Sequence, residues 1–469
     1  MDRELCQRLH EATLVLLERL GVRIESDEAL SLLADHGVPV DWPVRRAHPR
    51  AEDIDRALAT APRLVELYGR RTRDPLRIGG DQVYIVSGGG SLRVLTLEGV
   101  YEPSSWEHLR SFNVLLDALP NIHLCINQVD PQDDGGPGFY RRLAAEMLCT
   151  QPKPCSLQSS GPDDVRAFIE MGTALRGSRE ALAAKPVFRA GGNAEPPLCI
   201  PGNVAEVLIT AARAGVPSGI GDYSMMGITS PATVAGAVVQ LNAIQMTALV
   251  LSQAARPGAG VGYSTASGSG NMRTLDPVTA DPQTAQFLRL AIGLGHYYGL
   301  PVSSVALTDA RAPDPQAAAE RTLQLQTVVE AGAHQVQGPT SHMDQMMLSS
   351  YAQAVIDDDI VGYVLASRAR PEVNEDTLAF EAIADVISDP ALKDLKFAAH
   401  PHTVRRVRRQ TWQPRAFSAE AFGPWESAGR VSVVERATAV ARDILAHHRP
   451  EPLEPALERE IRRIAQAGV

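Results

Sequence analysis

The sequence predicts an α/β protein built on a closed (β/α)8 TIM barrel, with an N-terminal helical and hairpin extension and a C-terminal helical tail. Short apolar runs alternate with helical patterns at intervals of roughly 30–40 residues, the spacing of parallel βα units. Seven or eight such units follow one another. No dinucleotide-binding fingerprint follows the first strand, so a closed barrel is favoured over a doubly wound sheet.

Residues 1–103 are expected to form the N-terminal extension, packed on the barrel. Amphipathic patterns predict helices over 3–20, 27–36 and 51–61. Residues 81–103 then hold two β-rich runs on either side of the triplet Gly88-Gly89-Gly90. Two such runs around a glycine turn predict a β-hairpin.

Residues 104–390 are expected to form the barrel. The apolar runs predict strands over 122–127, 154–158, 186–190, 217–220, 259–263, 302–306 and 334–337. The patterns between them predict helices over 104–118, 138–149, 162–176, 203–213, 231–255, 282–299 and 315–331, with more from 343 onward. Because active sites of such barrels lie at the C-terminal ends of the strands, function is sought in the residues that follow each strand.

The helix expected over 231–255 lies in the longest uncharged stretch of the chain, between Asp222 and Arg256. A membrane span and a buried core helix both explain such a stretch. The buried helix is favoured, because glutamine and asparagine residues interrupt the apolar ones and the flanks carry no strong Lys/Arg bias. Ser230 is expected to cap this helix, with Pro231 at its first position.

Residues 391–469 are expected to form the C-terminal extension, with helices over 431–447 and 453–467. A basic cluster precedes these helices and is either a docking or subunit surface or a solvated helix face; it consists of Arg405, Arg406, Arg408 and Arg409.

Composition excludes several classes of protein. A net charge of −10 and a pI near 5.7 argue against nucleic acid as the main partner. The five cysteines form no C-x-x-C pair, which fits a reducing compartment and gives no zinc signature. The N-terminal segment lacks the apolar core of a secretion signal. We therefore expect a cytoplasmic protein with no membrane partner.

The strand ends nominate a set of polar and small residues as candidates for the active site. For each of them a helix cap or a loop hydrogen bond is the alternative role. In chain order they are Asn127, Asp130, Ser159, Ser160, Gly191, Gly192, Asn193, Asp222, Tyr223, Tyr263, Ser264, Asp309 and Gln337.

Two further segments suggest how an anionic group is bound. Thr229 and Ser230 stand where a loop becomes the long helix, whose N-terminus can bind a carboxylate; a plain helix cap is the alternative. The Gly- and Ser-rich segment 258–274 has neither the order of a phosphate loop nor a nearby lysine. Its Arg273 is either a carboxylate contact or a structural ion-pair partner.

Common catalytic motifs are missing from the sequence. Histidines do not occur at metal-ligand spacing, the closest pair being His400 and His402, and there is no H-E-x-x-H motif. No G-x-S-x-G elbow supports serine hydrolysis. The residues alone predict a metal-free α/β-barrel enzyme acting on a small, anionic substrate.

Ordered motifs over about residues 12–465 resemble the trimethylamine methyltransferase family. Each motif is weak by itself, and their order is what makes the resemblance specific. They are YGR (68–70), VSGGGSLRVLTLEG (86–99), LDALPNI (116–122), the Lys-Pro step at 153–154, AGVPSGIGDYSMMGITSPATVAGA (214–237), NMRT (271–274), YYGLPVSSVALTDARAPD (297–314), VIDDDIVG (355–362) and HPHTVRRVRRQTW-P (400–414).

The resemblance implies a TIM-barrel enzyme that passes a methyl group from a methylated amine to the Co(I) centre of a separate corrinoid protein. The corrinoid (cobalamin) is then carried by that partner, and this chain holds no metal. No pyrrolysine is present, so the chain resembles the branch whose characterised members demethylate quaternary amines such as glycine betaine, proline betaine or carnitine. A homo-oligomer is also expected.

A quaternary amine leaves as a neutral molecule and needs no proton, which agrees with the lack of an acid/base pair. The substrate cation is expected at Tyr223, Tyr263, Asp222 and Asp309, with Asp130 nearby. A betaine carboxylate is expected at Thr229 and Ser230 or at Arg273. Small and polar residues are expected where the corrinoid approaches the backbone, at Gly268, Gly270 and Asn271.

The resemblance also nominates catalytic residues. Gln337 stands where many relatives without pyrrolysine have a histidine thought to lie near the cobalt, and His334 and His342 are candidates to replace it; Asp309 completes the set. Two other functions stay open. One is a methyltransferase with a different donor or acceptor and no free corrinoid protein, and the other is a non-catalytic barrel that binds a betaine.

Overall fold

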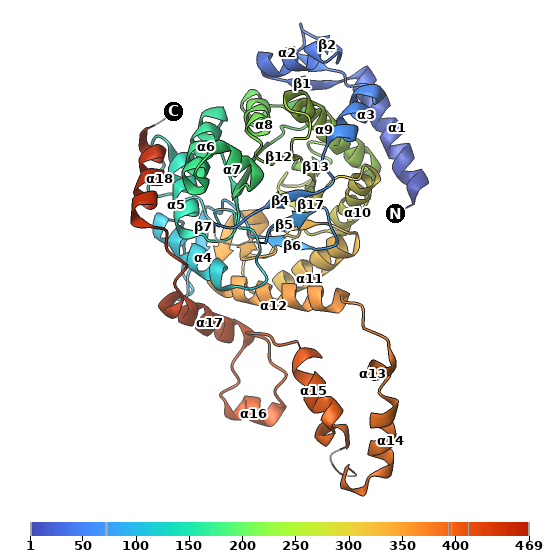
Figure 1. Cartoon of the computed structure of the whole chain (residues 1–469), viewed down its shortest axis with the longest axis vertical. Coiled ribbons are helices and arrows are strands. Elements are labelled where there is room, and N and C mark those ends of the chain that lie inside the picture. The colour runs from blue at the N-terminus through green and yellow to red at the C-terminus, as the bar shows by residue number, and fades with distance from the viewer. Residues whose placement is uncertain (1, 71–73, 393, 395, 411, 468–469) are drawn as a thin grey trace.

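The computed structural model describes residues 2–70, 74–392, 394, 396–410 and 412–467, which form a mixed α/β protein (Figure 1). Among these residues, parallel segments pair edge to edge and return to the first. The pairs run through β6 (Tyr84–Val86), residues 124–125, β9 (Cys155–Leu157), β10 (Phe188–Asn193), β12 (Ser218–Gly221), β14 (Tyr263–Thr265), β17 (Val302–Val305), β18 (Gln335–Gln337) and back to β6.

Each segment of this ring leads into a helix that packs on its outside. The order is α4 (Trp106–Ala118), α5 (Phe139–Thr150), α6 (Pro162–Arg176) with the short α7 (Arg179–Ala184), α8 (Gly202–Ala214), α9 (Val234–Ala255), α10 (Pro282–Tyr297), α11 (Pro315–Glu330) and α12 (Tyr351–Arg368). Asp281 and Asp314 cap α10 and α11, and each helix begins with proline, whose missing N–H is harmless there.

Helix α9 is the uncharged helix, and it is a core helix. By length and composition it is apolar enough to cross a membrane, yet 78% of its most apolar window is buried inside the protein. Its polar groups are paired there: Asn242 Nδ2 donates to Thr13 Oγ1 and to the Tyr298 hydroxyl. Because α9 is covered by α1, α3, α8 and α10, charged residues would be buried without partners at most of its positions.

The N-terminal helices form where expected, as α1 (Arg3–Arg19), α2 (Asp27–Asp35) and α3 (Ala51–Thr60). They accompany a small sheet of β2 (Val40–Asp41), β3 (Arg46–Ala47), β1 (Val22–Ile24) and β11 (Cys199–Ile200). Strand β11 comes from the loop after β10, so this sheet fastens the N-terminal extension to the ring.

A hairpin that the sequence analysis did not predict covers the N-terminal end of the ring. Its strands are β4 (Val65–Leu67) and β5 (Leu76–Ile78), paired antiparallel. Val65, Leu67 and Ile78 pack in one cluster with Val86 and with Leu124 of the ring. The hairpin therefore closes that end of the ring with apolar side chains.

The hairpin expected over 81–103 does not form between its two β-rich runs. The first run is β6, a parallel member of the ring, and the second is β7 (Arg93–Leu95), which pairs with β8 (Tyr101–Pro103) and β20 (Leu348–Ser350). The boundary expected at residue 104 thus falls after the first strand of the ring. Sequence alone misses this because β6 is specified by its pairing with β18, in which Tyr84 lies opposite Gln335, 251 positions further along the chain.

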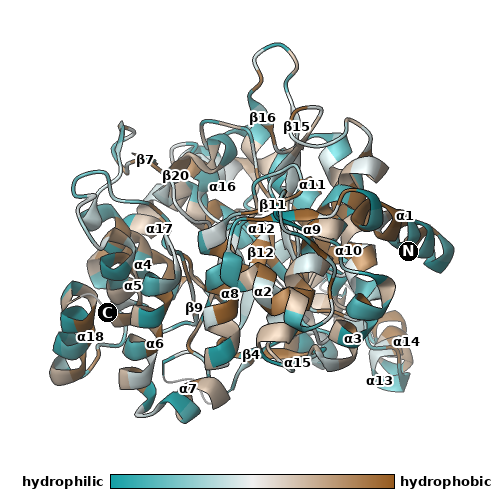
Figure 2. Cartoon of the chain, turned by 90° about the horizontal axis from the view of Figure 1, so that it is seen from above, coloured by the Kyte–Doolittle hydropathy of each residue, from teal (hydrophilic) through white to brown (hydrophobic). Residues whose placement is uncertain are grey.

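Two smaller groups of strands lie outside the ring. One sheet pairs β13 (Ser224–Met226), β15 (Ser267–Gly270) and β16 (Pro277–Val278), and Figure 2 shows the β15–β16 connection standing out from the body. Strand β19 (His342–Met343), followed by the 3-10 turn η1 (Asp344–Met346), pairs with β20.

After α12, residues 369–430 extend away from the body as a C-terminal arm (Figure 1), except at residues 415–417, which return to bond to Asp359 of α12. It contains α13 (Glu375–Leu378), α14 (Phe380–Ser388), η2 (Pro390–Leu392), η3 (Lys396–Ala399), α15 (Pro401–Gln410) and α16 (Phe422–Ser427). In the basic cluster, Arg406 pairs with Asp376 and Arg405 is exposed; the side chains of Arg408 and Arg409 lie outside the described residues. The chain returns through α17 (Val433–His447) and α18 (Pro455–Ala467).

Three consecutive aspartates in α12 anchor loops around this helix. Asp357 accepts the backbone N–H of Ser341, and Asp358 accepts that of Asn121. Asp359 accepts the N–H groups of Arg415 and the two residues that follow it. Successive helix residues point about 100° apart, so one triplet reaches three directions.

Candidate active site

A cavity of about 640 Å³ runs along the inside of the ring. Val65, Leu67 and Ile78 of the β4–β5 hairpin line its floor. At the other end it is lined by Asn193 and Gln337, the last residues of β10 and β18. We call this C-terminal end of the strands the mouth of the cavity.

The cavity exists because the inward positions of the ring are small. Bulky branched side chains normally fill the interior of such rings. Here, side chains alternate in and out along each strand, and the residues that line the cavity include Gly191, Gly219, Gly221, Ser264 and Ser303. Removing side-chain volume at these positions leaves space for a small molecule.

Glycine is required for close strand contact at one of these positions. A Cβ atom at Gly191 would lie 2.4 Å from the backbone oxygen of Gly219 on the neighbouring strand. The same addition at Gly219 would meet only the oxygen of Gly262, at 3.6 Å. The β10–β12 contact therefore needs glycine on one side and tolerates a side chain on the other.

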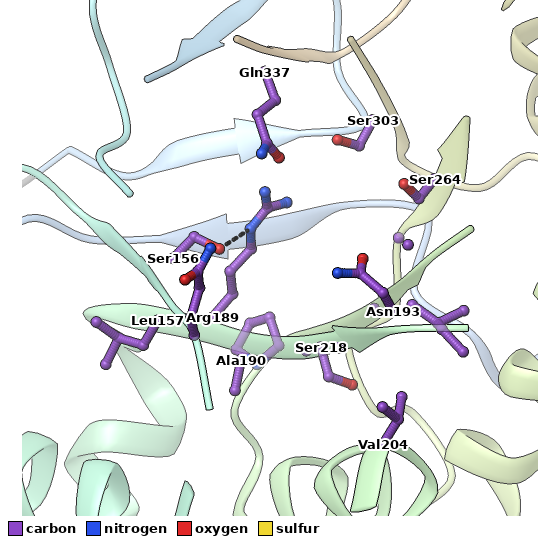
Figure 3. A pocket seen from close by; sticks show the side chains of 18 of the residues that line it. Ser156, Leu157, Arg189, Ala190, Asn193, Val204, Ser218, Ser264, Ser303 and Gln337 are labelled. Atoms are coloured by element: carbon purple, nitrogen blue, oxygen red, sulfur yellow. Dashed lines mark hydrogen bonds between the residues drawn. The ribbon is translucent and has the colours of Figure 1, made fainter. Parts of the chain in front are cut away.

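Arg189 of β10 projects into this cavity (Figure 3). Its Nε donates to Ser156 Oγ at 3.1 Å and its Nη1 donates to Gln335 Oε1 at 2.6 Å. Burial lowers the pKa of its guanidinium to about 10, and no carboxylate opposes this shift. In Figure 3, Gln337, Ser303 and Asn193 lie around the same space.

The charges of the cavity wall are arranged from floor to mouth. Within the described wall, the residues that carry a formal charge are the base Arg189 and the acid Glu195. Arg189 lies four residues before the end of β10, whereas Glu195 is exposed, two residues beyond it. The wall is thus cationic at depth and anionic at the mouth. Tyr140 is its aromatic residue, so an aromatic cage is absent from the described wall.

Two amide side chains, those of Asn127 and Gln158, connect Asp130 to the cavity wall near the mouth. Asn127 Nδ2 donates to Asp130 Oδ1 at 2.6 Å and to Oε1 of the lining residue Gln158 at 3.4 Å. Burial raises the pKa of Asp130 to about 6, although the bond from Asn127 lowers it. Asp130 is therefore a second acid close to the mouth.

The cavity collects several residues that the strand ends nominated. Gln337 lines it, as do Ser159, Gly191, Gly192, Asn193 and Ser264. They meet because the C-terminal ends of parallel strands share one end of the ring.

Asp222 and Tyr263, expected at a cation site, lie near each other but outside the cavity wall. The Tyr263 hydroxyl donates to Asn242 Oδ1 of α9 at 3.0 Å, so its side chain points away from the interior. Asp222 is buried and accepts from Ser224 Oγ at 2.7 Å. Burial raises its pKa to about 6. Strand alternation explains the outward direction of Tyr263, because the following residue, Ser264, faces inward.

Tyr223 and Asp309 form a second pair outside the wall. Burial raises the pKa of the Tyr223 hydroxyl, and the charge of Asp309 raises it further. The Asp309 carboxylate is already engaged, since it accepts from Thr279 N and Oγ1 and from Ala280 N. Asp309 thus holds the segment that enters α10.

The expected helix-terminus site at Thr229 and Ser230 does not form. Helix α9 begins at Val234, four residues after Ser230, and Ser230 does not cap it. Met225 explains the difference: its carbonyl accepts the N–H groups of residues 228–230, and its own N–H is bound by Thr229 Oγ1. This tight turn uses the residues that the sequence analysis assigned to the helix start.

The Gly-rich segment is divided between two places: Gly260, Gly262 and Ser264 line the cavity, whereas residues 267–274 belong to the β15–β16 hairpin. Arg273 is exposed at its tip, where its N–H donates to Asn271 Oδ1. A Cβ atom at Gly268 would lie 2.7 Å from the backbone oxygen of Val278, so this glycine permits close pairing within the hairpin. A Cβ atom at Gly270 would meet Ile228.

The two histidines near Gln337 occupy different places. His334 precedes β18, at the end opposite the mouth, and its Nδ1 accepts the N–H of Val302 at 2.9 Å. Burial lowers its pKa to about 4. It therefore cannot take the place of Gln337 at the mouth, since strand residues rise about 3.3 Å each.

His342 is fully buried beyond the end of β18, with its ring against Gly88. Burial lowers its pKa to about 3, and Arg321 lowers it further. Its ring nitrogens make no hydrogen bond of good geometry within the described residues, although the backbone of Gln128 is close enough to raise the pKa of the ring slightly against these effects. His342 does not line the cavity.

The residues that sequence reasoning missed lie in the middle of the strands. Arg189, Ser156 and Gln335 are not among the predicted site residues, because the prediction rests on the residues that follow each strand. A signal was present: Arg189 interrupts the apolar run PVFRA of a strand that helices cover on its outer side. A charged residue in such a strand has only the interior left to occupy.

No group of three or more His, Cys, Asp or Glu side chains that could hold a metal occurs in the described part of the chain. A polar cavity at the C-terminal ends of parallel strands is the arrangement of an α/β enzyme that binds a small molecule. The comparisons with known proteins specify this class.

The chain belongs to the trimethylamine methyltransferase (MTTB) family, whose model matches residues 1–466, and it is a methyltransferase. It is 27% identical to a glycine betaine methyltransferase from Desulfitobacterium hafniense strain Y51, over 98% of this chain and 95% of that protein. It is also 27% identical to the trimethylamine methyltransferase MttB of Desulfitobacterium hafniense strain DSM 10664 / DCB-2, over 98% and 91%.

Among solved structures, the hydroxylamine complex of MtmB has a similar fold, with a TM-score of 0.51 at 10% identity. The match covers 94% of this chain and 97% of that one. The family resemblance inferred from the ordered motifs is therefore confirmed, as is the mixed α/β fold.

Proposed function

We propose that the ring is a (β/α)8 barrel, and that the enzyme moves a methyl group from a betaine-like quaternary or tertiary methylamine to the Co(I) corrinoid of a partner protein. Family membership supports the donor class, and the open cavity of about 640 Å³ at the strand ends carries the proposal. A small amine fits in this volume, and its methyl group can face the mouth.

The Co(I) corrinoid of the partner is the methyl acceptor and supplies the nucleophile for an in-line displacement at the N-methyl carbon. The mouth residues suit an acceptor presented from outside, because Gly192, Gly221 and Asn193 leave the strand ends uncovered by bulky side chains. Gln337 offers an amide donor and acceptor there, but it cannot carry a proton. It is assigned the role of orienting the reacting end of the donor.

The chain contributes alignment and exclusion of water. A quaternary nitrogen leaves as a neutral amine, so no general acid is needed. Holding the donor in one orientation inside the cavity lowers the entropic cost of reaction. Glu195 and Asp130, near the mouth, provide negative charge for the ammonium end of the donor.

The test is methyl transfer to Co(I) cobalamin, followed by absorbance. Glycine betaine, proline betaine, carnitine and trimethylamine are the amine donors, and a methyl sulfonium compound is the alternative. We expect turnover with at least one quaternary amine. Turnover only with the sulfonium compound contradicts the donor assignment, and binding of a betaine with no turnover of any donor indicates a binding protein.

A matched pair of variants connects the activity to the cavity. Gly219→Val places a branched side chain in the cavity wall, at a position whose Cβ has room. We expect it to abolish methyl transfer while the protein stays folded. Gly135→Val adds the same atoms to an exposed loop, where a Cβ atom has nothing within 4 Å, and leaves activity unchanged. Equal activity of the two variants contradicts the placement of the site.

The remaining expectations are proposals of the same kind. A corrinoid protein docks at the mouth, copies of the chain associate, and the enzyme works in the cytoplasm. Size-exclusion chromatography with light scattering, with and without a corrinoid protein, measures both associations.

A further inference from the structure

The guanidinium of Arg189 has fewer partners than its position demands. Guanidinium carries five N–H donors, and the two bonds made here go to neutral oxygens, Ser156 Oγ and Gln335 Oε1. A buried cation without a counter-charge is costly. The described cavity wall supplies no carboxylate at this depth, since its acid, Glu195, is exposed at the mouth.

The side-chain amide nitrogen of Gln335 is another unused donor, next to the guanidinium of Arg189. Because Gln335 Oε1 faces the guanidinium, its Nε2 is fixed on the other side of the amide. This nitrogen is buried and has no hydrogen-bond partner among the described residues, while the whole residue is 2% exposed. A cation and a neutral N–H donor thus lie side by side with capacity left over.

The alternative is that Arg189 only braces three strands, β9, β10 and β18. A brace explains its bonds to Ser156 and Gln335. It does not explain why a full positive charge is used where a neutral amide would make the same bonds, nor why the inward neighbours Gly191, Ser264 and Ser303 are so small. A cavity lined by small residues next to an unneutralised cation indicates a ligand that brings the negative charge.

We propose that Arg189 and Gln335 form an oxyanion subsite that binds the acidic end of a zwitterionic donor. This inference rests on the proposed function, in which the cavity holds the methyl donor. Arg189 precedes Asn193 at the mouth by four strand residues, or about 13 Å of strand. An anion held at this depth directs the ammonium end of the donor toward the mouth, where Glu195 stands. Arg189 is then the residue that separates betaine-like donors from trimethylamine, which has no anionic end.

Calorimetric titration of the full chain tests the subsite without any turnover. The probes are glycine betaine and γ-butyrobetaine, which carry a carboxylate, phosphocholine, which carries a phosphate, and choline, which keeps the trimethylammonium group but carries no anion. We expect a carboxylate or phosphate probe to bind about 100-fold more tightly than choline, the size typical of a buried charge-assisted pair. The probe that binds most tightly shows whether the subsite takes a carboxylate or a phosphate.

Variants assign the preference to Arg189. Arg189→Met is expected to reduce the preference over choline to within about threefold, and Arg189→Lys to restore part of it, since lysine keeps the charge but loses the two-pronged geometry. Ser303→Ala is the matched control, because Ser303 lines the cavity and makes no hydrogen bond to Arg189. Thermal unfolding of Arg189→Met is expected at the wild-type temperature or above it.

Three results would overturn the subsite: equal binding of choline and the zwitterions by the wild type, an unchanged preference in Arg189→Met, or unfolding of both Arg189→Met and Arg189→Lys, which indicates a brace. Each leaves methyl transfer from an amine intact as a separate result. Conversely, anion-selective binding that depends on Arg189, with no methyl transfer from any donor, supports the subsite and removes the proposed function.

Discussion

Two arginines of the described residues have different surroundings: Arg321 is fully buried, whereas Arg189 is partly buried and faces the cavity. Arg321 of α11, outside the ring, donates through Nη1 to the carbonyls of Ala306 and Gly338, at 2.6 and 2.7 Å, and through Nη2 to that of His342. Its Nε also lies 3.3 Å from Asp357 Oδ1, and both side chains are fully buried. Arg189, inside the ring, has two neutral acceptors and no carboxylate.

This difference distinguishes an arginine that stabilises the fold from one that is available to bind a ligand. Arg321 holds the loop after β18 in place, because its terminal nitrogens bond to three carbonyls and its charge is paired with Asp357. Arg189 faces a cavity, where unused donors are available to a ligand. A cation whose counter-charge is a side chain of the protein is structural, whereas a cation that faces a cavity without a counter-charge indicates a site.

The largest effect is expected from Arg321→Met. This change leaves Asp357 buried without its counter-charge and frees the carbonyls of the loop. Loss of one partner of a buried pair costs about 3–5 kcal/mol in the free energy of unfolding. Urea denaturation measures it, with Arg189→Met as the comparison, for which little loss is expected. Equal losses of unfolding free energy in the two variants would contradict the claim that Arg321 is structural and Arg189 is not.

Asp222 offers a third buried charge with incomplete partners, since its Oδ2 has none among the described residues. Burial raises its pKa from 3.8 to about 6. The folded state therefore keeps a proton that the unfolded state releases between about pH 4 and 6, and the contribution of Asp222 to stability falls as the pH rises through this window.

Asp222→Asn removes this dependence. The stability of the variant relative to the wild type is expected to rise between pH 4 and pH 7, by at most about 3 kcal/mol. Urea denaturation at several pH values measures the difference, and other titrating groups cancel because both proteins share them. A difference that is flat with pH, or that falls, contradicts the raised pKa.

A smaller effect is expected in the wall of the cavity. Gly191→Ala forces a Cβ against the backbone of the next strand, where Gly219→Ala meets only ordinary contacts. We expect Gly191→Ala to lose about 1–3 kcal/mol of stability, as overpacked sites do, and Gly219→Ala to lose less than about 1 kcal/mol. Thermal unfolding compares the two. The reverse order of stability would show that the close β10–β12 contact is not what requires glycine.

The smallest effect is expected from Ser156→Ala, which removes one acceptor of Arg189. If the guanidinium binds the donor, this variant loses orientation of the group but keeps its charge. We expect about 1 kcal/mol, or roughly fivefold, weaker binding of a carboxylate donor, with unchanged binding of choline. Titration calorimetry measures both. A loss as large as that of Arg189→Met would assign the recognition to Ser156 instead.

Much of the fold was predictable from local pattern. The runs near 155, 188, 218, 302 and 335 form strands within a few residues of the predicted bounds. The uncharged helix is buried, as its glutamines and its one asparagine, Asn242, indicated. The hairpin expected around Gly88 was not recoverable, because β6 is specified by its distant partner β18 and not by its own residues.

The candidate site was likewise predictable only in part. Gln337 and Asn193 were predicted at the mouth because strand ends converge in any parallel ring. The direction of a side chain one residue away was not predictable: Tyr263 points to α9 while Ser264 faces the cavity, and a strand boundary known only to within a residue or two reverses such an assignment.

The sequence by itself determined the family, the alternation of strands and helices, and which strand ends carry polar residues, because these are properties of local pattern and order along the chain. Only the tertiary structure decided that Arg189 and Gln335, which are 146 residues apart, share one interior space, and that no carboxylate accompanies them. Closing a ring sets which strands become neighbours and which side chains face inward. The partners of a charged group depend on that closure and not on the residues next to it in the chain.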